Sequence, residues 1–164
     1  MTRYHRFETP LGPMYATARE HAITGIYFVG ARHAPAITPQ WHEAHGDALL
    51  QACARQLREY LDGRRRAFEL PLAPGGTAFQ ARVWREIAAI GFGETLTYAQ
   101  LAARAGAPGS ARAAGAATGR NPLSIVVPCH RVVGSRGALT GYAGGLERKD
   151  RLLAIEGARM PALA

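Results

Sequence analysis

The 164-residue chain has only two cysteines, a single lysine and no long apolar run. Cys53 and Cys129 lie 76 positions apart, which excludes a disulfide-rich scaffold and a Cys-x-x-Cys redox pair. No apolar stretch approaches the ~18 residues of a membrane-spanning helix. Residues 1–6 lack the apolar segment and cleavage site of a secretory signal. We therefore expect a soluble cytoplasmic protein, in the cytoplasm or nucleoid of a bacterium, with no membrane partner.

Acidic residues are also scarce, most of all in the second half of the chain. The formal net charge is +8, with 20 Lys+Arg against 12 Asp+Glu. Residues 1–73 carry a net charge of +2 and residues 74–164 a net charge of +6. Coding bias explains the preference for arginine over lysine as well as function does, but it does not explain the shortage of acids. The basic half indicates a polyanionic partner, first of all a nucleic acid.

The first seventy residues predict a small α/β domain. Alternating and β-branched residues predict three strands of an antiparallel meander, and helical spacing predicts one helix. The strands are expected at Arg3–Glu8, Met14–Arg19 and Ala22–Val29, the helix at Asp47–Leu61, and a further short strand at Phe68–Leu70. The Pro/Gly-rich segment 71–76 then predicts a boundary between domains at 1–73 and 74–164.

After this boundary the sequence predicts three helices. Capping boxes at Thr77–Gln80 and Thr97–Gln100 predict two of them, running to about Ile90 and Ala105. Ser110 can cap a third, Ala111–Thr118, which has almost no large side chains. Two helices joined by a Gly-containing turn, the second small and basic, are typical of a helix-turn-helix. Close packing inside an ordinary core is the alternative interpretation of such a helix.

The last third predicts an apolar strand at Leu123–Val127, a hairpin or wing at Val132–Tyr142 and a helix at Leu146–Ile155. The expected fold class is mixed α+β, with an N-terminal α/β domain followed by a winged-helix domain. Pro128 cannot continue a sheet, so the chain is expected to turn at Cys129 and His130. Imidazole and Arg131 beside the thiol favour the nucleophilic thiolate, although a lone buried cysteine is more often inert.

These residues carry a resemblance to a known family. The segment Pro128-Cys129-His130-Arg131, preceded by Asn121-Pro122 and followed by Gly141-Tyr142-Ala143-Gly144-Gly145, resembles the O6-alkylguanine-DNA alkyltransferases. The resemblance covers roughly residues 76–157. Its other motifs are Phe79-Gln80-x-x-Val83-Trp84, Phe92-Gly93-Glu94-x-x-x-Tyr98, Ala111-Arg112-Ala113 and Glu156-Gly157. The first seventy residues match only in layout, which in that family is ribonuclease H-like.

The resemblance implies repair of DNA by direct reversal, in which an alkyl group passes irreversibly from O6-alkylguanine, and also from O4-alkylthymine, to Cys129. It makes His130 a base acting through water, Glu156 the residue that orients this base, and Asn121 a brace for the turn. Tyr98 would contact the phosphate and the flipped base. The implied partner is double-stranded DNA, with no cofactor and no metal. We expect a monomer, with cooperative binding along DNA left open.

The resemblance also assigns a DNA-binding surface and an alkyl pocket. Arg112 is the finger that fills the space of the extruded base. The other DNA-binding residues are Ser110, Ala111, Ala113, Gly115 and Gln80. The pocket residues are Thr118, Pro128, Val132, Tyr142, Ala143, Gly144 and Gly145. Ala143 stands where some relatives have serine, and Gly119-Arg120 stands where some have Arg-Gly.

Two alternatives belong to other functional classes. A winged-helix protein that binds alkylated DNA without reacting would carry a different residue at the acceptor position, so Cys129 argues against it. A cysteine hydrolase would need an oxyanion site, for which the sequence shows no motif. Zinc binding by His33, His42 and His45 near Cys53 is disfavoured, because loop histidines at such spacings are commonly solvated.

Overall fold

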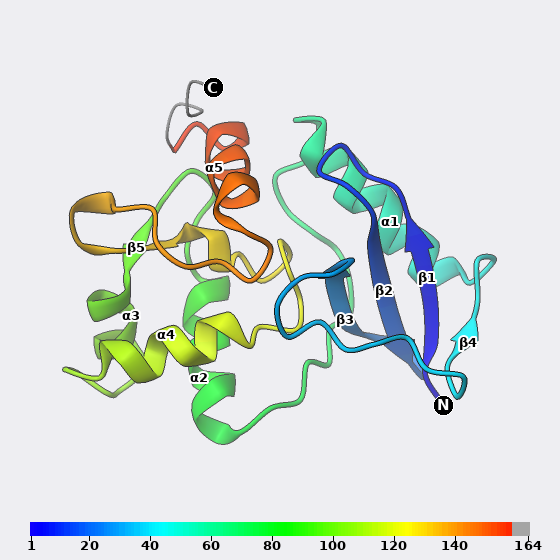
Figure 1. Cartoon of the computed structure of the whole chain (residues 1–164), viewed down its shortest axis with the longest axis horizontal. Helices are drawn as coiled ribbons and strands as arrows, with labels where there is room; N and C mark the ends of the chain where they lie inside the picture. Colours follow the sequence, from blue (N-terminus) through cyan, green and yellow to red (C-terminus); the bar gives the residue numbers. More distant parts are fainter. Residues whose placement is uncertain (159–164) are drawn as a thin grey trace. The chain divides into compact units, whose positions relative to one another are not determined.

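The computed structural model describes residues 1–158, which divide into two units (Figure 1). The first contains residues 1–75 together with Pro122–Ser124. The second contains Gly76–Asn121 and residues 125–158. No helix within residues 1–158 is both long and apolar enough to cross a bilayer.

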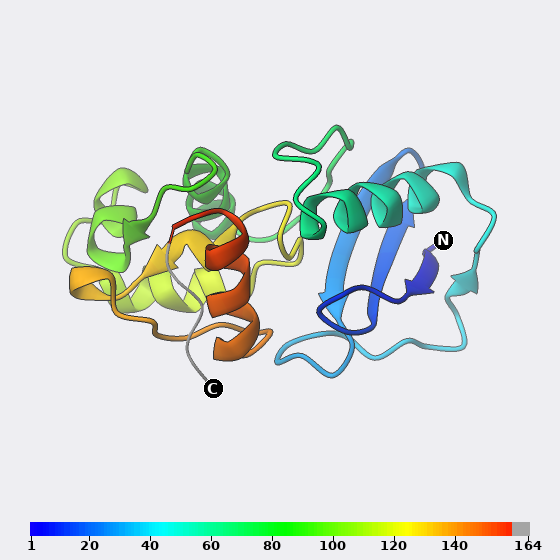
Figure 2. The ribbon, with the colours of Figure 1, turned by 90° about the horizontal axis from the view of Figure 1, so that it is seen from above.

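The first unit is a four-stranded sheet covered by one helix. Its strands are β1 (Arg3–Phe7), β2 (Met14–Arg19), β3 (Ala22–Phe28) and β4 (His42–Glu43), arranged in the order β3-β2-β1-β4. The meander β1-β2-β3 is antiparallel, whereas β4 pairs parallel to β1. Helix α1 (Ala48–Leu61) packs along one face of this sheet (Figure 2). The predicted meander and helix are confirmed.

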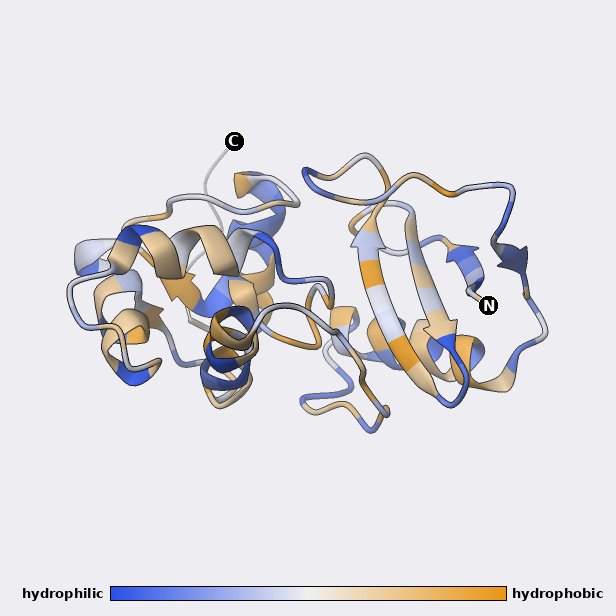
Figure 3. Ribbon diagram, turned by 90° about the horizontal axis from the view of Figure 1, so that it is seen from below, coloured by the Kyte–Doolittle hydropathy of each residue, from blue (hydrophilic) through white to orange (hydrophobic). Residues whose placement is uncertain are grey.

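Helix α1 is amphipathic and its buried side completes the core of the unit. Asp47 caps the helix by accepting a hydrogen bond from the Leu50 N–H at 3.0 Å. Leu50, Cys53 and Leu57 are fully buried beneath the sheet. Figure 3 shows apolar and polar positions interspersed along the strands. The first unit is thus held by an ordinary apolar core.

The second unit is mainly helical. Its elements are α2 (Ala78–Ala88), β5 (Leu96–Thr97), α3 (Tyr98–Arg104), α4 (Ala111–Gly119), β6 (Val132–Val133) and α5 (Leu146–Ile155). Both predicted capping boxes are present: Thr77 pairs reciprocally with Gln80, and Thr97 with Gln100. The chain turns between α3 and α4 through two glycines with positive φ, Gly106 and Gly109. The predicted helix-turn-helix is therefore formed.

Some predicted elements were wrong. Leu123–Val127 is a series of turns, because buried Ile125 adopts φ 72° and no ladder can continue through it. The hairpin predicted over 132–142 does not form: β6 pairs parallel to β5, and a short 3₁₀ turn closes with Gly134 N–H on Ala138 O. Residues 68–70 form no strand; the neighbouring Leu72 makes an isolated bridge to Ile23.

Candidate active site

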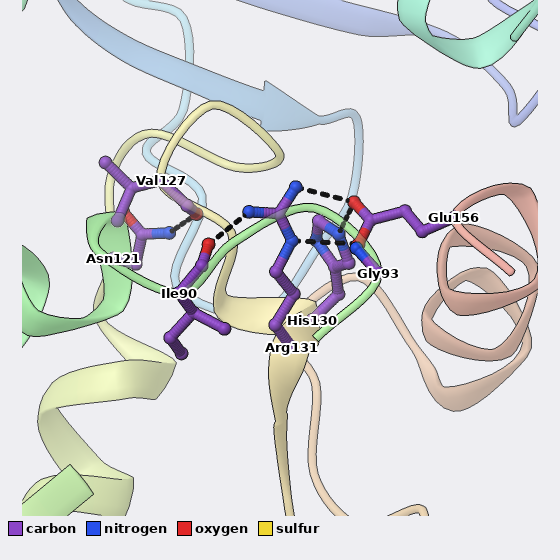
Figure 4. Close-up of polar contacts among 7 residues, drawn as sticks. All are labelled: Ile90, Gly93, Asn121, Val127, His130, Arg131 and Glu156. Atoms are coloured by element: carbon purple, nitrogen blue, oxygen red, sulfur yellow. Dashed lines mark hydrogen bonds and ion pairs between the residues drawn. The ribbon is translucent and has the colours of Figure 1, made fainter. Parts of the chain in front are cut away.

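Cys129 lies on a tightly constrained turn. It begins a 3₁₀ turn, Cys129–Arg131, directly after Pro128, whose φ of -82° and ψ of 66° give an inverse γ-turn. The Cys129 N–H donates to the Val127 carbonyl at 2.8 Å. The buried Asn121 side chain donates to the same carbonyl, also at 2.8 Å (Figure 4). The turn is where the sequence predicts it, and Asn121 braces it from the end of α4.

A buried charge cluster lies beside this turn (Figure 4). His130 is fully buried, and its Nε2 lies 2.9 Å from Glu156 Oε2. The Arg131 guanidinium donates to both Glu156 oxygens at 2.8 Å, and also to the Ile90 carbonyl at 2.5 Å. The Gly93 N–H donates to Glu156 Oε1 at 3.1 Å. Arg131 and the Gly93 N–H therefore fix the Glu156 carboxylate, and the carboxylate in turn fixes the His130 ring.

This environment keeps His130 neutral. Burial lowers the pKa of His130 below its ordinary value, and Arg131 and Lys149 lower it further, while the hydrogen bond and charge of Glu156 oppose them. A neutral imidazole held through Nε2 can accept a proton on its other nitrogen. The geometry thus suits a base, as the resemblance implies.

The thiol of Cys129 is subject to opposing influences. Burial raises the pKa of Cys129, whereas the Asn121 hydrogen bond, the positive charge of Lys149 and the Tyr142 hydrogen bond lower it. Arg131, which the sequence suggested as the cation favouring the thiolate, instead places its guanidinium on Glu156. That expectation was wrong, because the carboxylate binds the guanidinium in a bidentate pair. The cation that acts on the thiol is Lys149.

Lys149 is the only lysine of the chain and is fully buried. Its Nζ donates to the carbonyls of Val132, Thr140 and Gly141 at 2.5, 2.7 and 2.9 Å. Three convergent carbonyls match the three N–H groups of an ammonium and would not match a planar guanidinium. Sequence reasoning missed this residue. A signal existed: Lys149 occupies the buried stripe of α5 with Leu152, Leu153 and Glu156, at helical spacing.

Tyr98 lies at the start of α3, between two segments that carry glycine. Its hydroxyl donates to the Thr140 carbonyl at 3.3 Å, and its ring centroid lies 5.8 Å from Lys149 Nζ. A Cβ on Gly115 of α4 would approach the ring to 3.7 Å, and one on Gly141 would approach the hydroxyl to 3.5 Å. Tyr98 therefore joins the surface of α4 to the segment that follows β6.

The sequence disfavours zinc binding by His33, His42 and His45, all of which lie within the described residues 1–158. No group of three or more His, Cys, Asp or Glu side chains there is placed to hold a metal ion. His45 instead contacts His5, with 2.8 Å between their Nδ1 atoms, and pairs with Glu43. Cys53 is buried in the core of the first unit.

Comparison with known proteins agrees with this geometry. Residues 78–158 match the DNA-binding domain of 6-O-methylguanine DNA methyltransferase, and residues 2–74 match its ribonuclease-like domain. The chain is 40% identical to the methylated-DNA–protein-cysteine methyltransferase of Methanosarcina acetivorans, over 94% of this chain and 97% of that protein. It is 41% identical to that of Mycolicibacterium paratuberculosis, over 99% and 96%. The chain belongs to this family.

Solved structures of the methyltransferase family also resemble the chain. The crystal structure of Mycobacterium tuberculosis OGT in complex with DNA has a TM-score of 0.87 and 38% identity, covering 98% of this chain and 96% of that one. The archaeal O6-methylguanine-DNA methyltransferase of Pyrococcus kodakaraensis has a TM-score of 0.55 and 26% identity, covering 96% and 99%. The two family matches leave a gap at residues 75–77, which overlaps the end of the Pro/Gly-rich segment 71–76.

The methyltransferase motifs for DNA binding lie mostly on α4. Arg112 and Ala113 are exposed, whereas Ser110, Ala111 and Gly115 are half-buried. The Ser110 side chain makes no cap hydrogen bond, contrary to prediction. Gln80 lies on α2, where its Oε1 closes the capping box with Thr77.

The methyltransferase pocket motifs come from α4, from the two ends of the Cys129 turn and from the segment before α5, and most of them are less accessible. Thr118, Pro128 and Val132 are buried, Tyr142, Ala143 and Gly144 are half-buried, and Gly145 is exposed. The Thr118 hydroxyl donates to the Ala114 carbonyl at 2.7 Å, so it supports α4 from within. The Val132 carbonyl already accepts a hydrogen bond from Lys149.

Proposed function

We propose that the chain is a DNA repair protein that transfers an alkyl group from O6 of guanine in double-stranded DNA to the sulfur of Cys129. One observation carries the proposal: a thiol on a rigid turn adjoins a neutral, buried histidine that Glu156 holds in place. The family membership and the exposed Arg112 on α4 support the choice of DNA as substrate.

The reaction is a displacement at carbon. The Cys129 thiol gives its proton to His130 through a water molecule, and the thiolate attacks the carbon attached to O6. The S–C bond forms while the C–O6 bond breaks, and the oxygen keeps the electron pair. The released guanine anion then takes up a proton and becomes ordinary guanine. Water does not readily hydrolyse a thioether, so each molecule repairs one lesion.

The buried cluster prepares this step. Glu156 stabilises the imidazolium that forms on His130, while Arg131 and the Gly93 N–H hold the carboxylate in position. Lys149 stabilises the developing thiolate by its charge. These groups are fixed before substrate binds, so little reorganisation accompanies the reaction.

Helix α4 brings the duplex to the thiol. Small side chains on its exposed face allow close approach to the minor groove, and Arg112 enters the base stack in place of the damaged guanine. Tyr98 lies between α4 and the 140–141 segment, where it can contact the extruded nucleotide. Contacts of other arginines with phosphate position the duplex without reading its sequence.

Intact-mass measurement tests the proposal. After incubation with duplex DNA carrying O6-methylguanine, we expect the protein to gain one methyl group, which peptide mapping places on Cys129. Cys129→Ser should bind the same duplex and gain nothing. Binding without any gain of mass would instead indicate a non-catalytic reader of alkylated DNA, and repeated turnover would exclude a thioether product.

A further inference from the structure

Helix α4 lacks the side-chain caps that its neighbours have at their ends. Helices α2 and α3 each begin with a complete capping box, whereas the Ser110 side chain forms no cap hydrogen bond. Helix α4 is nine residues long and includes Gly115 and Gly119, which weaken a helix. It ends at Arg120 without a left-handed glycine cap and has no basic residue in its last turn. Tertiary contacts must therefore determine where its last turn lies.

Trp84 of α2 provides such a contact. Its buried indole N–H donates to the Ala117 carbonyl in the last turn of α4, at 2.8 Å. The same carbonyl also accepts a longer backbone bond, from the Arg120 N–H at 3.2 Å. The indole thus satisfies a helix-end carbonyl that the backbone satisfies weakly.

The position of the indole is in turn set by Gly76. This glycine has φ 90°, and a Cβ there would lie 2.5 and 2.6 Å from two atoms of the Trp84 ring. The backbone of residue 76 therefore lies directly against the ring. Gly75 also has a positive φ, 70°, but a Cβ at that position would meet nothing within 4 Å. The indole is held between Gly76 and α4 within the second unit.

We propose that Trp84 is a positioning residue for duplex binding, which acts by fixing the last turn of α4 through the Ala117 carbonyl. The inference rests on the proposed function, since it assigns α4 to the duplex. Arg112 lies one turn and a half before Ala117, so a shift or fraying of this end changes the surface offered to DNA. The thiol turn is braced separately, by Asn121 on the Val127 carbonyl.

The test separates duplex binding from chemistry. Trp84→Phe keeps a ring but removes the N–H, and Trp41→Phe makes the same change in the first unit as a control. Each protein is measured for affinity to unmodified duplex, for single-turnover reaction with O6-methylguanine in duplex, and for reaction with O6-methylguanine as the free base. For Trp84→Phe we expect about a tenfold loss in duplex affinity and in the duplex reaction at limiting DNA. The free-base rate should stay within about twofold.

A second pair of variants moves the indole without altering it. Gly76→Ala should displace the ring and reproduce the Trp84→Phe pattern, whereas Gly75→Ala imposes similar backbone strain without a clash. Unchanged duplex affinity in Trp84→Phe, or equal losses with duplex and free base, would overturn the proposal. Failure of the wild-type chain to transfer any alkyl group would refute the proposed function instead. The affinities of the wild type and Trp84→Phe for unmodified duplex would still test whether Trp84 contributes to duplex binding.

Discussion

The two cysteines of this chain lie in regions that are equally buried but chemically different. Cys53 faces the apolar core beneath the sheet, and burial alone raises its pKa to about 12. Cys129 is buried as well, yet Asn121, Lys149 and Tyr142 each oppose the effect of burial. The polar groups around the sulfur, rather than its exposure, therefore distinguish the two thiols.

The difference follows from the elements that carry each cysteine. Cys53 lies in the middle of α1, where every backbone group is used within the helix and the side chain meets only packed neighbours. Cys129 begins a 3₁₀ turn after a strained segment, and polar groups converge on it from three places: Asn121 just after α4, Tyr142 before α5 and Lys149 on α5. Strained backbone of this kind is maintained only where the surrounding structure enforces it.

Replacing each cysteine by serine gives the largest expected contrast. Cys129→Ser should abolish alkyl transfer, because the hydroxyl is a far weaker nucleophile than a thiolate. Under conditions in which it is folded, Cys53→Ser should transfer one methyl group at a rate within about twofold of the wild type. Single-turnover assays with labelled O6-methylguanine duplex measure both. A methyl group found on Cys53 would contradict the comparison.

Removing the buried cation should make the Cys129 region resemble that of Cys53. Lys149→Met eliminates the charge that lowers the Cys129 pKa and leaves three carbonyls without this donor. We expect the transfer rate to fall about 100-fold, and iodoacetamide to react with Cys129 only at a higher pH than in the wild type.

Arg148→Met is the control for Lys149→Met. Its side chain is half-buried and donates to the Gly144 carbonyl at 3.2 Å, one position along the same helix. This variant should keep both the rate and the alkylation profile. Circular dichroism establishes that both variants are folded. An unchanged alkylation profile in folded Lys149→Met would show that its charge does not act on the thiol.

The pH dependence of transfer should report His130. Because burial lowers the pKa of His130 below 6.5, the imidazole is neutral at pH 7 and becomes protonated only in more acidic solution. The single-turnover rate should therefore fall as the pH drops below 6.5, approaching about tenfold per pH unit. Cys53→Ala should give a superimposable profile. A rate that declines already between pH 8 and 7 would contradict a lowered pKa.

Local signals predicted much of this molecule. Strand alternation, the two capping boxes and the glycine turn between α3 and α4 all depend on neighbouring residues, and each formed as expected. The predicted hairpin at 132–142 did not form because β6 pairs with β5, thirty-six positions earlier, and the local pattern does not encode this long-range pairing. The strand predicted at Leu123–Val127 did not form for a related reason. An apolar run does not reveal that Ile125 is held at positive φ.

The site shows the same division. Cys129, His130 and Asn121 could be found from their own segment and the motifs around it. The partner of Arg131 could not, because Glu156 comes from the end of α5 and captures the guanidinium only after the helix has docked. Lys149 was overlooked because a lysine is ordinarily exposed. Its place on the buried face of α5 is evident only once that face is known.

The smallest expected effect is on stability and concerns Cys53 alone. Cys53→Ala should lower the free energy of unfolding by about 1 kcal/mol at pH 7, a typical value for a small change in a core.

A folded-state pKa of about 12 lies above the ordinary value of 9.0, so the folded chain holds this proton more tightly than the unfolded chain. That contribution is complete below pH 9 and is lost as the pH rises from 9 towards 12. Urea unfolding of both proteins from pH 7 to 10.5 should therefore show the gap between them narrowing above pH 9, since every other titrating group is common to both. A gap that stays constant would mean that the Cys53 thiol ionises as readily in the fold as outside it, and that the apolar core does not suppress the thiolate.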